Sequence, residues 1–218
     1  MVRRPFSHQR EGDRDPYWDA FINTPPADPN NVLPHAFSQV RDGETNPVRA
    51  EVHSPNVLSS HIKELGRFYG ADLIGIVGLP AVSGAASFSP EGVPVDSVRD
   101  SIHSPEGVSS GAQGFAIVTV LKADYDTRTS RGVGGQTPAL KGLFATFTLA
   151  AYIRELGYRA TRVFGEDNRG DRLAAAAGLG RLNAEGRLVS PRFGRLVYVA
   201  ELIFTDLPLE PDGQEIAP

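Results

Sequence analysis

The sequence predicts a layered α+β domain, an α/β sandwich, and three observations support this prediction. Apolar residues recur at helical spacing between residues 58 and 69. Unbroken apolar runs over 71–77 and 115–121 are typical of strands that are covered on both faces. Helical and strand-like segments then alternate along the rest of the chain, with long loops between them. Such an alternation favours a sheet packed against helices.

The composition is that of one sizeable globular domain, and it excludes several classes of function. The chain has 218 residues, 40% of them hydrophobic, and no apolar run is long enough to span a bilayer. A net charge of −4 argues against nucleic acid as the main partner. The absence of cysteine excludes an iron–sulfur cluster and a cysteine-ligated zinc ion, and the five histidines lack zinc-site spacing. We therefore predict no zinc or iron–sulfur site, and no other metal ligand set.

Residues 1–55 are expected to form an arm that packs on the domain of residues 56–212, with a short tail over 213–218. Proline at the density found in this arm disfavours regular helices and central strands. Apolar residues that a solvated tail rarely carries predict that the arm is ordered, with a disordered tail as the alternative. These apolar anchors are Tyr17, Trp18, Phe21, Ile22 and Phe37.

The pair Arg3-Arg4 is not interpreted as a twin-arginine export signal. The residues that follow, PFSHQREGDRDPYWD, contain no apolar segment and no small-residue cleavage site. We therefore expect a cytoplasmic protein.

The first half of the domain is predicted to contain one helix and two strands. Leu58, Ile62, Leu65 and Tyr69 follow one another at spacings of four, three and four, which places them on one face of a helix. A glycine directly afterwards ends this helix, and the apolar run that follows is predicted as a buried strand. The segment 78–114 is rich in glycine, serine and proline and is predicted as a long loop before the second strand.

A long helix is predicted to begin at Thr137 and Pro138, with Thr137 as the N-cap and Pro138 in the first helical position. Apolar residues continue to Leu156, and Gly157 supplies a C-terminal stop. The elements predicted after this helix are a strand over 158–164, a short helix over 172–177 and a final strand over 196–204.

Three sequence blocks follow one another closely near the end of the chain. They are AGLG at Ala177–Gly180, LVSPRFG at Leu188–Gly194 and FTDLPL at Phe204–Leu209. In this order they resemble the last segment of the corrinoid-binding domain of reductive dehalogenases and epoxyqueuosine reductases. Two weaker matches are GADLIGI at Gly70–Ile76 and NPVRA at Asn46–Ala50. The resemblance implies a nitroreductase-like, cobalamin-binding fold over most of the domain.

The sequence departs from this family at the residues that carry its chemistry. In the family these blocks precede a ferredoxin-like module whose cysteines hold two iron–sulfur clusters, whereas this chain has no cysteine and ends at Pro218. The tyrosine that donates a proton in the dehalogenases is missing from the start of the long helix, where Lys141 lies nearest. The turn after AGLG has Ala184 where the family has a basic residue. Lys141, if buried, and Tyr125 are therefore the candidate catalytic residues, with a solvated lysine and turn packing as alternatives.

The resemblance places the corrinoid in a cleft between the AGLG turn, the SPRFG turn and the loop after the strand at 115–121. Backbone groups and small hydroxyl side chains suit the amides at the edge of a corrinoid. Glycines let backbone approach a flat ligand, although a helix C-cap is the alternative, and their spacing is not that of a dinucleotide site. The candidate cofactor-binding residues are Thr119, Lys122, Gly178, Leu179, Gly180, Ser190, Pro191, Phe193 and Gly194.

Other ionisable residues have simpler interpretations. Asp124 and Asp126 favour turn chemistry, and Asp171 favours the start of a helix, where a carboxylate is stabilised by the helix dipole. The loop histidines are candidates for a lower axial ligand to cobalt, and these are His35, His53 and His103.

We expect this chain to bind, store or deliver a corrinoid, without iron–sulfur clusters of its own. The alternative is a cobalamin-dependent reductase, acting in reductive dehalogenation or cobalamin processing, that takes electrons from an external ferredoxin or flavoprotein. A second alternative is an FMN-binding, nitroreductase-like protein. Neither nucleic acid nor a membrane is expected as a partner, and a homodimer is left open.

Overall fold

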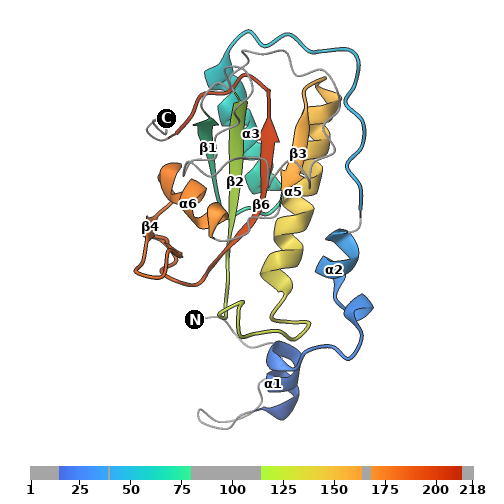
Figure 1. The fold of residues 1–218 in the computed structure, drawn as a ribbon, viewed down its shortest axis with the longest axis vertical. Coiled ribbons are helices and arrows are strands. Elements are labelled where there is room, and N and C mark those ends of the chain that lie inside the picture. Colours follow the sequence, from blue (N-terminus) through green and yellow to red (C-terminus); the bar gives the residue numbers. More distant parts are fainter. Residues whose placement is uncertain (1–14, 39, 80–113, 164–167, 213–218) are drawn as a thin grey trace, which may run out of the picture.

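The structure is a computed structural model that describes residues 15–38, 40–79, 114–163 and 168–212. Its centre is a four-stranded sheet in which every neighbouring pair of strands is antiparallel, in the order β1-β2-β6-β3 (Figure 1). The predicted α+β fold is thereby confirmed. The strands are β1 (Leu73–Leu79), β2 (Gly114–Lys122), β3 (Ala160–Val163) and β6 (Val197–Thr205).

Helices cover both faces of this sheet. On one face lie α3 (Pro55–Phe68) and α5 (Thr137–Glu155), which share a core with the strands. On the other face lies α6 (Arg169–Ala176), together with a short hairpin formed by β4 (Arg181–Leu182) and β5 (Leu188–Val189). The domain is therefore a sandwich of three layers, with the sheet in the middle.

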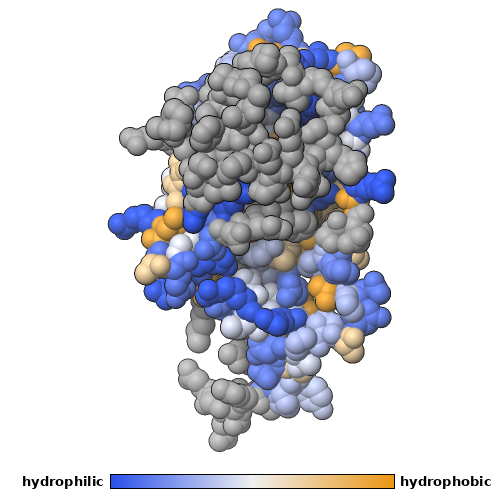
Figure 2. All heavy atoms as spheres, in the orientation of Figure 1, coloured by the Kyte–Doolittle hydropathy of each residue, from blue (hydrophilic) through white to orange (hydrophobic). Residues whose placement is uncertain are grey.

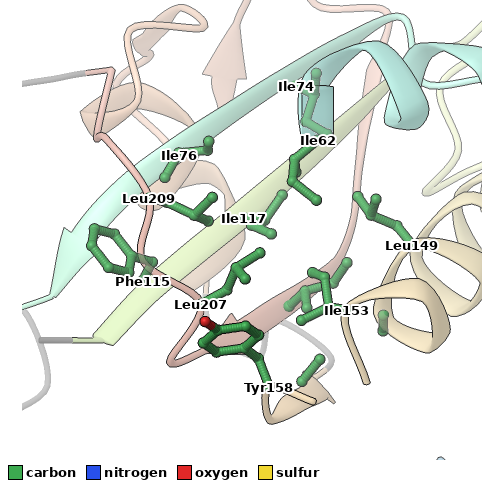
Figure 3. Packing of buried hydrophobic residues seen from close by; sticks show 13 residues of the cluster. Ile62, Ile74, Ile76, Phe115, Ile117, Leu149, Ile153, Tyr158, Leu207 and Leu209 are labelled. Carbon is green, nitrogen blue, oxygen red and sulfur yellow. The ribbon is translucent and has the colours of Figure 1, made fainter. Parts of the chain in front are cut away.

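The central position of β2 explains the unbroken apolar run in its sequence. Phe115 and Ile117 belong to the core cluster formed with α3 and α5, and Figure 3 shows this cluster between the sheet and the helices. Ala116 and Val118 belong to the cluster on the α6 face. Because alternate residues enter two different cores, no interior position of the strand faces water, which favours apolar residues throughout. Thr119 is the polar exception among these buried positions.

The long helices begin where proline and a short polar turn permit it. In α3 the Ser54 hydroxyl accepts the N–H of Val57 at 3.4 Å, and proline occupies the first helical position. The N-cap predicted for α5 is wrong by one residue. Gln136 occupies the N-cap position, since its carbonyl already accepts the N–H of Leu140, and the Thr137 hydroxyl donates instead to a carbonyl of the preceding turn.

The prediction that proline excludes regular helices from the arm is wrong for the described part of that segment. This part contains α1 (Pro16–Asn23), α2 (Leu33–Ser38) and a 3₁₀ turn, η1 (Pro29–Asn31). Each element has its proline in the first turn, at Pro16, Pro29 and Pro34. Backbone N–H groups of the first turn have no partner within the helix, so proline removes no hydrogen bond there.

The arm contacts the loop that follows β2. Ile22 is buried, and its carbonyl accepts the N–H of Gly132 at 2.7 Å. The indole N–H of Trp18 donates to the hydroxyl of Tyr125 at 3.0 Å. Tyr17, another of the apolar anchors, is 86% exposed. The arm therefore covers one side of this loop and engages one of the two candidate catalytic residues.

The NPVRA block joins the arm to the end of the domain. The N–H groups of Asn46 and Ala50 donate to backbone carbonyls at the C-terminal end of α5. Between them, Arg49 donates to the carboxylate of Asp206 at 2.8 Å. Asp206 belongs to the FTDLPL block, so two of the sequence blocks that carry the resemblance are in contact with each other. Both blocks thus have a structural role in closing the domain.

Some predicted segments lie outside the described residues. These are nearly all of the long loop predicted over 78–114, the end of the strand predicted over 158–164, and the tail over 213–218. In the part of the chain that the structure describes, no helix combines the length and the apolar content needed to cross a membrane.

Candidate functional site

A polar pocket lies beside the outer edge of β6. β3 pairs with β6 only at 202–205, so among the described strands none pairs with the outer edge of Val197–Glu201. The pocket has a volume of about 280 Å³ and lies between this edge, the loop after β2, the start of α6 and the β4–β5 hairpin. Figure 2 shows mostly hydrophilic residues at the level of α6 and the hairpin. This polar pocket is the candidate ligand site of the described residues.

Two of the arginines that line the pocket are paired with carboxylates. Arg128 donates from Nε and Nη2 to Asp126 at 3.1 and 3.0 Å, and its Nη1 lies 3.6 Å from Glu185. The hydrogen bonds from Arg128 hold the pKa of Asp126 below its usual range. Arg187 lies 3.4 Å from Asp171, which also accepts a backbone N–H of β5. Most of the charge in the pocket is therefore neutralised locally.

Arg195 and Tyr198 line the same pocket and have no such partners among the described residues. Arg195 is exposed, and within the described ranges it has neither an ion pair nor a hydrogen bond. The Tyr198 hydroxyl has no hydrogen-bond partner among the described residues, although its side chain is half-buried. Burial raises the pKa of Tyr198, and the nearby Glu201 carboxylate raises it further. The phenol is therefore protonated at neutral pH and is able to donate a hydrogen bond.

Glu201 lies at the inner end of the pocket, in a buried network that reaches the arm. It is 4% exposed and accepts hydrogen bonds from Thr146 at 2.8 Å and Arg162 at 3.2 Å. Arg162 also donates to Asp42 of the arm at 2.7 Å. Burial raises the pKa of Glu201, whereas the hydrogen bond from Thr146 and the charge of Arg162 oppose that rise. The register of β2 and β6 shifts beside Glu201, and such a bulge re-aims side chains.

The glycine turn after α6 is a helix C-cap. Gly178 has a φ of +74° and donates its N–H to Ala175, while Leu179 donates to Ala174. These two bonds form a Schellman motif, in which glycine is preferred at the left-handed position. Gly180 has a different constraint, because a Cβ there would lie 2.5 Å from the carbonyl oxygen of Val189. The local packing accounts for both glycines without a ligand.

Replacing Gly178 with alanine is expected to lower the free energy of unfolding by about 1 kcal/mol, because alanine resists a positive φ. No atom lies within 4 Å of the position that the new Cβ would occupy, so the cost is conformational and not steric. Urea unfolding measures the difference. Gly43→Ala is the matched control, since Gly43 has equal space without a positive φ and should show no loss. Equal losses in both variants would contradict the C-cap assignment.

The SPRFG turn closes on itself at the base of the same hairpin. Ser190 and Gly194 exchange two backbone hydrogen bonds, at 2.8 and 2.9 Å, and the Ser190 hydroxyl accepts the N–H of Arg192. Pro191 is exposed and Phe193 is half-buried. Because Gly180 packs on the residue before Ser190, the structure brings these two candidate segments together. They lie beside the hairpin that lines the pocket, but they do not line it themselves.

The other candidate residues are dispersed. Thr119 is buried in β2, and its hydroxyl has no partner among the described residues. Lys122 lies exposed at the end of β2, 3.7 Å from Asp124. Lys141 is exposed on α5, so it lacks the burial that its proposed role requires. Neither Lys141 nor Tyr125 lines the pocket.

The histidines and acidic residues do not form a metal site in the described structure. No group of three or more His, Asp or Glu side chains within it could hold a metal ion. His53 lies 3.6 Å from Glu51 and His61 contacts the hydroxyl of Tyr152, while His103 lies outside the described residues. None of the described histidines lines the pocket.

Sequence reasoning missed the residues that do line the pocket. They come from separate segments and include Arg128, Asp171, Arg187, Arg195, Tyr198 and Glu201. One signal was present, since a glutamate interrupts the otherwise apolar strand at 197–204. A buried carboxylate in a central strand requires polar partners, so this glutamate marks a functional or structural polar site, and Glu201 itself lines the pocket.

Comparison with known proteins relates this architecture to one group of enzymes. No family model matches the chain. Tetrachloroethene reductive dehalogenases of Dehalobacter restrictus and Desulfitobacterium hafniense are 33% identical over 101 residues, which is 44% of this chain and 18% of theirs. A solved reductive dehalogenase structure, described as suggesting a mechanism for B12-dependent dehalogenation, matches 83% of this chain, with a TM-score of 0.58 and 22% identity. The chain is similar to reductive dehalogenases in sequence and in fold.

The match extends to other reductive dehalogenase structures. A variant of the catabolic reductive dehalogenase NpRdhA aligns with 90% of this chain at a TM-score of 0.60 and 21% identity. Epoxyqueuosine reductase from Bacillus subtilis reaches a TM-score of only 0.42, which is too low to show a shared fold. The predicted resemblance is thus confirmed for the dehalogenases. This chain spans about a quarter of the length of their structures and matches about a fifth of the curated sequences.

Proposed function

We propose that this chain binds a corrinoid and supplies part of the corrinoid site of a reductive dehalogenase-like protein. The observation that supports this most strongly is the shared fold, which extends over 83% of the chain and is found in a protein described as B12-dependent. Fold alone does not carry function, so the residues at the site must also suit the cofactor.

The polar pocket suits the edge of a corrinoid and not the whole molecule. The amides around a corrin ring need donors and acceptors. The pocket offers the Asn183 side chain, arginines and the edge of β6 that pairs with none of the described strands. Its volume of about 280 Å³ lies below the roughly 300–1,000 Å³ of pockets that enclose drug-sized ligands. The described residues therefore fit one part of the cofactor's periphery. A corrinoid bound there would supply a redox-active cobalt ion.

The geometry favours a role in binding, storage or delivery over catalysis. Lys141 and Tyr125, the two candidate proton donors, lie outside the pocket, and Tyr125 accepts a hydrogen bond from Trp18. The 218 residues contain no cysteine with which to hold an iron–sulfur cluster. A reductase built on this chain would therefore need electrons from a separate donor, such as a ferredoxin or flavoprotein.

Titration of the purified chain with hydroxocobalamin tests the proposal. We expect saturable binding by calorimetry and a shifted cobalt absorbance spectrum. Arg128→Gln should weaken binding because Arg128 lines the pocket, whereas Arg181→Gln should not, since Arg181 is exposed on β4 and outside it. Saturable binding of FMN without any binding of hydroxocobalamin would overturn the corrinoid proposal and favour a flavoprotein.

A further inference from the structure

A cation and a tyrosine hydroxyl of the pocket have no partner among the described residues. The cation is Arg195 and the hydroxyl is that of Tyr198, and they lie three residues apart at the start of β6. An arginine that lines a pocket without a carboxylate partner can form its ion pair with a ligand. The half-buried Tyr198 hydroxyl makes no hydrogen bond to the described residues, so it is free to donate one to a ligand atom.

The acidic residues of the pocket do not cancel this charge. Asp126 is held by Arg128 through two hydrogen bonds, and Asp171 is held by Arg187 and a backbone N–H. Glu201 is held by Thr146 and by Arg162, which approaches it from β3, outside the pocket lining. Glu185, whose side chain is 66% exposed, lies 3.6 Å from Arg128. The four carboxylates of the lining outnumber its three arginines, but each of them lies near a cation other than Arg195. Arg195 is therefore the arginine of the lining that no carboxylate engages within the described residues.

We propose that the pocket binds an oxyanion, a carboxylate or a phosphate ester, through the guanidinium of Arg195 and the hydroxyl of Tyr198. A guanidinium presents two parallel N–H donors that match two oxygens of such a group. The backbone of Val197–Glu201, whose outer edge pairs with none of the described strands, lines the pocket on the same side. Because the phenol is protonated at neutral pH, it donates to an oxygen and does not repel its charge.

The oxyanion has two chemically equivalent sources. It is either the carboxylate or phosphate of a separate small molecule, for which about 280 Å³ is sufficient space, or the phosphodiester in the nucleotide loop of a cobalamin. The second source rests on the proposed corrinoid function, whereas the first does not. Cobinamide lacks the phosphodiester and keeps the corrin ring, so it separates the two sources.

The test is an NMR titration of the whole chain with benzoate and with dimethyl phosphate at low ionic strength. We expect shifts in the amide signals of residues 197–201, and a dissociation constant about tenfold weaker in Arg195→Gln and about threefold weaker in Tyr198→Phe. Tyr198→Phe removes an oxygen that has no internal partner, so the fold should be unchanged. Arg181→Gln is the matched control, with the same loss of charge outside the pocket, and its dissociation constant should stay within about twofold of that of the unmodified chain.

Competition then identifies the source. Displacement of dimethyl phosphate by hydroxocobalamin and not by cobinamide assigns the phosphodiester, whereas displacement by neither assigns a separate small molecule. Absence of hydroxocobalamin binding beside intact dimethyl phosphate binding overturns the proposed function and leaves the oxyanion site standing. Absence of binding by both anions, or equal weakening in Arg195→Gln and Arg181→Gln, overturns the oxyanion site.

Discussion

Replacing Arg162 with methionine is expected to lower the free energy of unfolding by about 3–5 kcal/mol, because the change leaves the buried carboxylate of Glu201 without its cation. The Arg162 side chain is only 6% exposed and bridges Glu201 of β6 to Asp42 of the arm. Its guanidinium also lies over the ring of Phe147. Methionine fills a similar volume, so the loss measured by urea unfolding reports mainly on charge. The control is Arg159→Met, whose side chain is 39% exposed and pairs with Asp206, for which about 1 kcal/mol or less is expected.

The pH dependence of this loss identifies the carboxylate responsible. Burial already raises the pKa of Glu201 above its ordinary value of 4.5, and removal of Arg162 raises it further. With its pKa raised, Glu201 binds a proton more tightly in the folded state than in the unfolded state. The free energy of unfolding therefore falls as the pH rises from about 4.5 through the raised pKa of the folded state. The loss of unfolding free energy caused by Arg162→Met should therefore be largest at neutral pH and become smaller as the pH falls toward 4.5. A deficit that is constant from pH 7 to 4.5 would exclude Glu201 as its cause.

Replacing Leu207 with alanine is expected to lower the free energy of unfolding by about 2–5 kcal/mol, because the substitution leaves a cavity in the core. Leu207 has an exposed fraction of 0% and packs in the cluster between the sheet and α3 and α5 (Figure 3). Leu182→Ala is the control, since Leu182 is 40% exposed and should change stability by about 0.5 kcal/mol or less. Urea unfolding monitored by circular dichroism measures both variants.

The Leu207 experiment also tests the role of the FTDLPL block. Leu207 does not line the pocket, so the folded variant should bind hydroxocobalamin as the unmodified chain does. A loss of ligand binding with unchanged stability would contradict a structural role for this block.

The fold followed from the sequence where one physical effect dominates. The apolar run at 115–121 predicts a strand covered on both faces, and β2 is such a strand. Helix starts were harder to place, because they depend on which of several competing local hydrogen bonds forms. The helix predicted from residue 172 begins at Arg169, after Asn168 adopts a φ of +61° and bonds to the hairpin. In the arm, proline density suggested an irregular chain, but the position of each proline within its turn allows a helix.

The pocket could not be derived in the same way. Its lining combines the loop at 126–128, the start of α6, the hairpin at 183–188 and the edge of β6. These segments meet beside Val197–Glu201, whose outer edge none of the described strands pairs with, and no single segment of the sequence marks such a meeting point. The candidate residues chosen by resemblance include turns whose glycines are explained by backbone geometry. Their contribution to cofactor binding remains a prediction.

The place of β6 in the sheet has a consequence for the order in which the protein is made. Of the described strands β6 is the last to be synthesised, yet it lies between β2 and β3, and residues just beyond it bond back to β1 and α3. A nascent chain that has not yet released residue 205 therefore exposes the bare edge of β2, without β6 to pair with it. Contacts such as Arg49 with Asp206 span 157 positions, which favours slow folding. During synthesis the four-stranded sheet is thus expected to stay incomplete until β6 emerges.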